Sequence, residues 1–97
     1  MVYNIEEIKQ KLESIFNNYD VTRAILFGSY AKNMADINSD IDIAIETSLG
    51  GLKFIGLVEQ IRETMQKEVD VIGMRYIEKD SKIEREIKET GVEIYGG

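Results

Sequence analysis

The stretch that decides the fold is residues 22–46, TRAILFGSYAKNMADINSDIDIAIE. Its first part, residues 22–27, is short and apolar and ends at a glycine, which predicts a buried strand. Its last part, residues 40–46, alternates strictly between polar and apolar side chains. This alternation predicts a second strand whose two faces have different surroundings. The residues between them are mostly small or polar, so we expect two strands joined by a glycine turn and a polar connection.

Helical and strand patterns alternate on both sides of this stretch. Apolar residues at helical spacing follow a candidate N-cap at Asn4, and the same spacing recurs twice later in the chain. The predicted helices span residues 5–19, 52–66 and 76–88. Short β-branched runs predict two further strands, over residues 68–72 and 92–95. This order predicts a single α/β (α+β) domain over residues 1–97, with helices packed against a small sheet.

The composition excludes several classes of functional site. The chain has 97 residues with no His and no Cys, which rules out His-dependent and Cys-dependent triads, zinc fingers and disulfide scaffolds. Its net charge is −6, from 18 acidic and 12 basic side chains, and this argues against direct nucleic-acid binding. The sequence has neither the pattern of a signal peptide nor that of a membrane span, so we expect a cytoplasmic protein.

Two carboxylates share one face of the predicted 40–46 strand. Asp40 and Asp42 are two residues apart, so their side chains lie about 7 Å apart and repel each other. A hard cation such as Mg²⁺ removes this repulsion, because it prefers oxygen ligands. Asp70 joins them if its predicted strand lies beside this one. Aspartate is a poor strand former, so we favour a ligand role over the simpler interpretation of a solvent-facing strand.

Gly28 and Ser29 provide the second half of a phosphate site. A glycine at the end of a buried strand allows a sharp turn close to a ligand, and the N–H groups of a helix starting at Ser29 or Tyr30 are anion donors. A triphosphate held there, with its metal ions on the aspartates, has the arrangement needed for in-line displacement at phosphorus. These residues therefore predict nucleotidyl or phosphoryl transfer.

The spacing of these residues resembles a known family signature. Gly28-Ser29, ten further residues and Asp40-x-Asp42 are similar to the Gly-Ser-x10-Asp-x-Asp pattern of minimal nucleotidyltransferases in the DNA polymerase beta superfamily. The resemblance implies the nucleotidyltransferase fold with a mixed sheet, and ATP as substrate. It also implies two Mg²⁺ ions held by Asp40, Asp42 and Asp70. The nucleotide-binding residues that it implies are Gly28, Ser29 and Lys32.

Two positions depart from the family pattern. Lys32 stands where the family often has Arg, which keeps the charge but loses bidentate phosphate geometry. Taken alone, Lys32 is most simply a solvated lysine. Asn33 stands where Gly is common, and since Asn tolerates a positive φ better than most residues, we expect the turn to survive.

The resemblance also implies a partner protein. Small nucleotidyltransferases of this kind are typically antitoxins, which inhibit a HEPN-type toxin by binding and by adenylylation of a toxin tyrosine. A chain of this length leaves no room for an acceptor pocket, so a partner must present the acceptor. The alternatives are a non-catalytic antitoxin that neutralises its partner stoichiometrically and, more weakly, nucleotidyl transfer to a small molecule. Homo-oligomers and hetero-oligomers both remain open.

Two other features have simpler structural interpretations. Tyr30 and Tyr76 are expected to be packing or interface residues rather than nucleophiles. The mixed charges of residues 78–86 are expected to form a solvated helix face with spaced ion pairs.

Overall fold

The computed structural model describes residues 2–96 as alternating helices and strands. The helices are α1 (Ile5–Asn18), α2 (Gly28–Ala31), α3 (Gly51–Met65) and α4 (Lys82–Thr90), with a 3₁₀ turn η1 (Met74–Tyr76) before α4. The strands are β1 (Val21–Phe27), β2 (Ile41–Thr47), β3 (Val69–Gly73) and β4 (Val92–Gly96). In this part of the chain no helix combines the length and the apolar character that crossing a bilayer requires.

The strands form one mixed sheet in the order β3-β2-β1-β4. β1 is antiparallel to both β2 and β4, whereas β2 and β3 are parallel neighbours. Parallel strands need a crossover connection, and α3 provides it. The mixed sheet predicted from the family resemblance is confirmed. The strands of Asp42 and Asp70 are adjacent, as their convergence requires.

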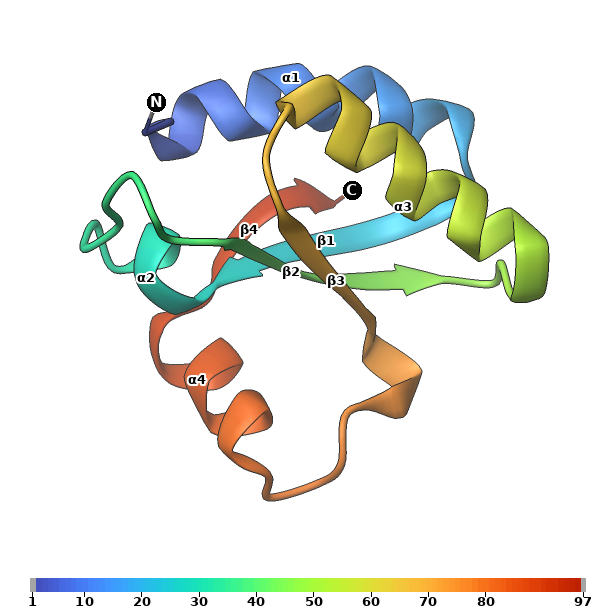
Figure 1. The fold of residues 1–97 in the computed structure, drawn as a ribbon. Coiled ribbons are helices and arrows are strands. Elements are labelled where there is room, and N and C mark those ends of the chain that lie inside the picture. The colour runs from blue at the N-terminus through green and yellow to red at the C-terminus, as the bar shows by residue number, and fades with distance from the viewer. Residues whose placement is uncertain (1, 97) are drawn as a thin grey trace.

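One face of the sheet is covered by α1 and α3, which lie side by side across it (Figure 1). Alternate residues of β2, Ile41, Ile43 and Ile45, point into this layer and are completely buried. α1 begins with a reciprocal capping box between Asn4 and Glu7, which satisfies backbone donors at the helix start. The filled layer between these helices and the sheet is the hydrophobic core of the domain.

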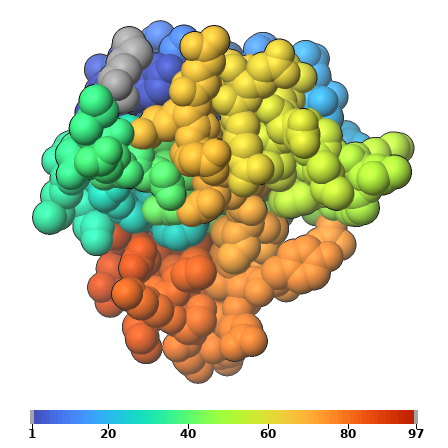
Figure 2. Space-filling model, in the orientation of Figure 1, coloured from blue at the N-terminus to red at the C-terminus, as the bar shows by residue number. Residues whose placement is uncertain are grey.

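The opposite face of the sheet is less completely covered. α4 packs against β1 and η1 packs against β2, and the segment from η1 to α4 forms the lower part of the molecule (Figure 2, orange to red). A cavity of about 410 Å³ lies between these elements and β1, lined by Ile25, Met74, Ile87 and neighbouring charged side chains. This face therefore leaves polar groups of the strands within reach of solvent.

The prediction of a helix over residues 76–88 is wrong at its start. The chain makes a 3₁₀ turn up to Tyr76, and α4 begins only at Lys82. Asp80 has a left-handed φ of 65°, which a continuous helix cannot contain. Ser81 is the N-cap, since its hydroxyl accepts a hydrogen bond from the Glu84 N–H. The local cap thus outweighed the sparse apolar periodicity.

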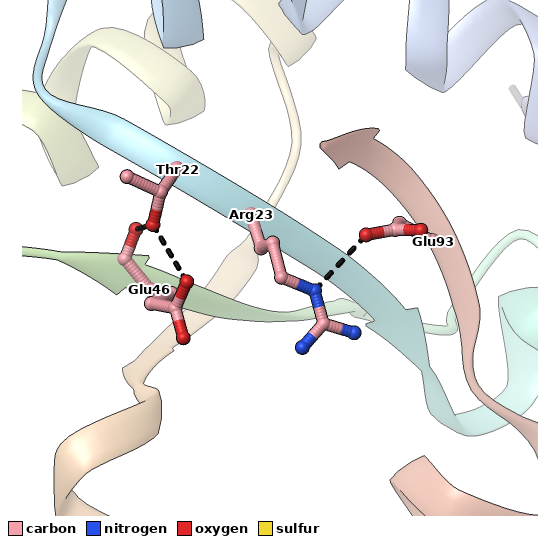
Figure 3. Close-up of polar contacts among 4 residues, drawn as sticks. All are labelled: Thr22, Arg23, Glu46 and Glu93. Carbon is pink, nitrogen blue, oxygen red and sulfur yellow. Dashed lines mark hydrogen bonds and ion pairs between the residues drawn. The ribbon is translucent and has the colours of Figure 1, made fainter. Parts of the chain in front are cut away.

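The end of the sheet away from Gly28 is tied by polar contacts on its surface (Figure 3). Arg23 of β1 forms an ion pair with Glu93 of β4, with Nε 3.0 Å from Oε1. The Thr22 hydroxyl donates to the Glu46 carboxylate of β2 at 2.7 Å. Both contacts are exposed, so their contribution to the free energy of unfolding is small. The Arg23–Glu93 ion pair joins two strands at this end, whereas Asp42 and Asp70 at the other end form no ion pair with a basic side chain among residues 2–96.

Candidate functional site

Asp42 and Asp70 lie directly opposite each other on neighbouring strands. The register pairs Asp42 of β2 with Asp70 of β3. Their chain neighbours Ile41, Ile43 and Val69 are completely buried in the core, so by strand alternation both carboxylates project from the α4 face. Asp40 precedes β2 by one residue and is exposed. The structure therefore brings two of the three predicted carboxylates together, with the third beside them.

The turn at the end of β1 lies against the Asp42 carboxylate. Phe27, the last residue of β1, pairs with Asp42, and α2 begins at the next residue, Gly28. Gly28 has a φ of 74°, and a methyl group added there would collide with Oδ2 of Asp42. A glycine is required both by this backbone conformation and by the close approach. Ser29, half-buried in α2, follows directly, which agrees with the predicted helix start beside the turn.

The carboxylate of Asp42 is electrostatically strained as an anion. Burial, followed by the negative charges of Asp70, Asp40 and Glu86, raises its pKa from 3.8 to about 6. Each of these causes disfavours the charged form. Hard oxygen donors in a region of excess negative charge suit a divalent cation such as Mg²⁺. Within residues 2–96, however, no three acidic side chains are already arranged as a metal-ligand set, so the metal site remains a prediction.

The two positions that depart from the family pattern are both placed in this region. The Lys32 backbone N–H closes α2 by donating to the carbonyls of Gly28 and Ser29, and its side chain is exposed. A contact between Lys32 and a triphosphate therefore stays a prediction. Asn33 has a positive φ of 57°, which confirms that it supports the turn in place of glycine.

The contribution of α4 to this site was not predicted from the sequence. The prediction that residues 78–86 form a solvated helix face is wrong in two respects. Residues 78–81 precede α4, and Glu86 is half-buried with its charge acting on Asp42. The ion pair recorded on this helix joins Glu84 to Lys88, outside the predicted range, at 3.7 Å. The apolar stripe of Ile83 and Ile87 puts Glu86 on the flank of that stripe, and this was the available signal.

The two tyrosines also differ from each other in their surroundings. Tyr30 is 2% exposed and packs in the core, as expected of a packing residue. Tyr76 is 71% exposed and its ring lies beside the Arg75 guanidinium.

Comparison with known proteins identifies the family to which this fold belongs. The model of the polymerase beta nucleotidyltransferase family matches residues 10–97. The chain belongs to this family of nucleotidyltransferases. A protein of Methanocaldococcus jannaschii with the provisional name protein adenylyltransferase MJ0435 is 44% identical over 71 residues, which are 71% of this chain and 76% of that protein.

Solved structures share the fold at lower sequence identity. A chain from a toxin–antitoxin crystal structure with AMP-PNP superposes with a TM-score of 0.75 at 22% identity, covering 92% of this chain and 73% of the other. A chain from the complex of a tri-AMPylated Shewanella oneidensis HEPN toxin with its MNT antitoxin gives a TM-score of 0.69 at 19% identity, covering 96% and 73%. At these identities the likeness establishes the nucleotidyltransferase fold alone.

Proposed function

We propose that this chain transfers AMP from ATP to a tyrosine hydroxyl of a HEPN-type toxin and acts as the antitoxin of that partner. The observation that carries the proposal is the pairing of Asp42 with Asp70 directly beside the Gly28 turn. The name of the M. jannaschii relative and the AMPylated toxin in the S. oneidensis complex support the same acceptor chemistry. Because ATP is the donor, we place the reaction in the cytoplasm.

The roles of the site residues follow from their chemistry. Asp40, Asp42 and Asp70 would hold two Mg²⁺ ions, and Gly28, Ser29 and Lys32 would contact the triphosphate. Bound Mg²⁺ neutralises charge that develops on the phosphate oxygens. The chain's own residues then orient the α-phosphate in line with the acceptor oxygen.

The transfer itself is a substitution at phosphorus. The tyrosine oxygen of the partner forms a bond to the α-phosphorus of ATP, and the bond from this phosphorus to the bridging oxygen breaks. Pyrophosphate leaves with the electron pair of that bond. The hydroxyl proton goes to a nearby base, and Asp70 is the residue that we assign to this step.

Label transfer to the partner tests the proposal. The purified chain is incubated with ATP labelled at the α-phosphate, Mg²⁺ and the protein encoded by the neighbouring gene. We expect labelled partner from the native chain and from Asp20→Ala, a control at an exposed aspartate outside the site. For Asp42→Ala and Asp70→Ala we expect at least about a 10³-fold loss. Absence of label, or equal transfer by Asp42→Ala, would contradict the proposal.

A second measurement separates catalysis from binding. The variant with alanine at residues 40, 42 and 70 is titrated against the toxic activity of the partner. We expect loss of protection at catalytic doses of the antitoxin. Full neutralisation by this variant at equal molar dose would instead identify a stoichiometric binding module.

A further inference from the structure

The loop between α2 and β2, residues 32–40, connects the two halves of the proposed nucleotide site. It follows α2, the short helix that contains Gly28 and Ser29, and it ends at Asp40. Met34 and Ile37 in this loop are 72% and 68% exposed. Apart from Ala35, which packs against the core, the loop gains little from apolar burial. Its order must therefore depend on polar contacts.

Most hydrogen bonds of the loop are local. The Asn38 and Ser39 backbone N–H groups both donate to Asp36, and the Met34 N–H donates to the Ser29 carbonyl. These contacts shape the loop, but they do not attach its middle to the rest of the fold. Within residues 2–96, one hydrogen bond joins residues 35–39 to a distant part of the chain, from Lys67 Nζ to the Ile37 carbonyl at 3.3 Å.

Lys67 also contacts the element that begins the loop. Its ammonium lies 6.0 Å from the ring centroid of Tyr30, a buried residue of α2, at the outer limit of a cation–π contact. Lys67 is half-buried and sits between α3 and β3, three residues before Asp70. The adjacent Glu68 carbonyl accepts the N–H of Ile41 at the start of β2. One side chain thus spans α2, the loop and the entry to β3.

We infer that Lys67 is a positioning residue that holds the 32–40 loop in the arrangement needed for nucleotide binding. It acts through the Ile37 carbonyl and the Tyr30 ring, which fix the loop between Ser29 and Asp40. The inference rests on the proposed nucleotidyl transfer for its functional consequence. When a smaller fraction of the molecules has the loop in the competent arrangement, the apparent affinity for nucleotide falls in proportion to that fraction. The rate at saturating nucleotide is retained.

Hydrogen exchange tests the structural part of the inference without any substrate. Lys67→Met keeps the length of the side chain but removes its charge and its donor groups. We expect amide exchange in the 32–40 loop to be about five- to tenfold faster, which is the range for the loss of one ordinary, exposed hydrogen bond. Lys67→Arg should restore native exchange within about twofold. The matched control is Lys53→Met on the exposed side of α3, for which we expect native loop exchange.

Titration with ATP in the presence of Mg²⁺ tests the functional part. For Lys67→Met we expect a Kd and a KM about five- to tenfold higher than native, with kcat changed by less than about twofold. Lys67→Arg should recover the native values. Unchanged loop exchange and unchanged affinity in Lys67→Met would overturn the inference, and so would a loss of kcat alone. If the native chain binds ATP but transfers no label, the proposed function fails. The inference about Lys67 is then still tested by the amide exchange of the loop and by the Kd for ATP.

Discussion

The two faces of the sheet are built from the same alternating strands, yet they differ in filling and in charge. The face under α1 and α3 contains Ile41, Ile43 and Ile45, all completely buried. The face under α4 contains Asp42 and Asp70, with an open cavity farther along β1. Apolar packing stabilises the first face. Like charges held together destabilise the second, because burial and neighbouring carboxylates disfavour the Asp42 anion.

This difference indicates that the face under α1 and α3 stabilises the fold, whereas the face under α4 carries the candidate site. Carboxylates that repel each other in the free protein are not already neutralised by basic side chains, so they remain available to a cation, at a cost in stability. The filled face has to compensate for that cost. The following predictions test this comparison through the free energy of unfolding, measured by urea denaturation of a domain small enough for two-state behaviour.

Ile43→Ala should have the largest effect, because it opens a cavity in the filled face. We expect it to lower the free energy of unfolding by about 3 kcal/mol. The control is Ile72→Ala on the other face, where the side chain is only half-buried, and the expected loss is about 1 kcal/mol. Equal losses in the two variants would show that the faces are equally packed.

Gly28→Ala should have the next largest effect, at the border of the site. The positive φ and the collision with Asp42 both oppose a side chain here, so we expect a loss of about 2 kcal/mol. Gly56→Ala in α3 is the control, since nothing lies within 4 Å of the added methyl group. There we expect a gain of up to about 1 kcal/mol. A neutral Gly28→Ala would contradict the close approach.

Asp42→Asn should stabilise the free protein at pH 8. Since the pKa of Asp42 is raised from 3.8 to about 6 in the fold, its stabilising contribution is present below pH 4 and is lost as the pH rises through 6. Asparagine does not ionise, so it loses no stability as the pH rises. We expect a gain of about 1 kcal/mol at pH 8 with EDTA, because water screens this partly exposed group, and little gain at pH 4. Urea titrations at several pH values give the difference.

Added Mg²⁺ provides the control for this prediction. It should stabilise the native chain at pH 8 and leave Asp42→Asn nearly unchanged. A native chain that is more stable than Asp42→Asn at pH 8 in EDTA would show that the carboxylate is not strained.

Tyr30→Phe should have the smallest effect and tests the filled face at a polar atom. Among residues 2–96, the buried Tyr30 hydroxyl has no hydrogen-bond partner, so its removal should raise the free energy of unfolding by up to about 1 kcal/mol. The matched variant is Tyr3→Phe, which loses a 2.8 Å hydrogen bond to the Met65 carbonyl and should cost about 1 kcal/mol. The same sign for both variants would contradict this assignment.

The local elements of the fold were predictable because their signals lie within a few residues. The alternation of residues 40–46 predicted β2, and the glycine after an apolar run predicted the turn at Gly28. The start of α4 was missed, because a cap at Ser81 and a left-handed Asp80 compete with apolar periodicity. The roles of Glu86 and Lys67 were also missed, since both depend on contacts between segments far apart in the chain.

By itself, the sequence determined the strands, the helices except the start of α4, and the spacing from Gly28-Ser29 to Asp40 and Asp42, because periodicity and turn chemistry act over short distances along the chain. Only the tertiary structure decided that β2 and β3 are parallel neighbours in a register that sets Asp70 opposite Asp42. It also decided that the turn at Gly28 touches Asp42 and that burial shifts the pKa of this carboxylate. Strand order and burial come from the packing of the whole chain, which no local pattern encodes.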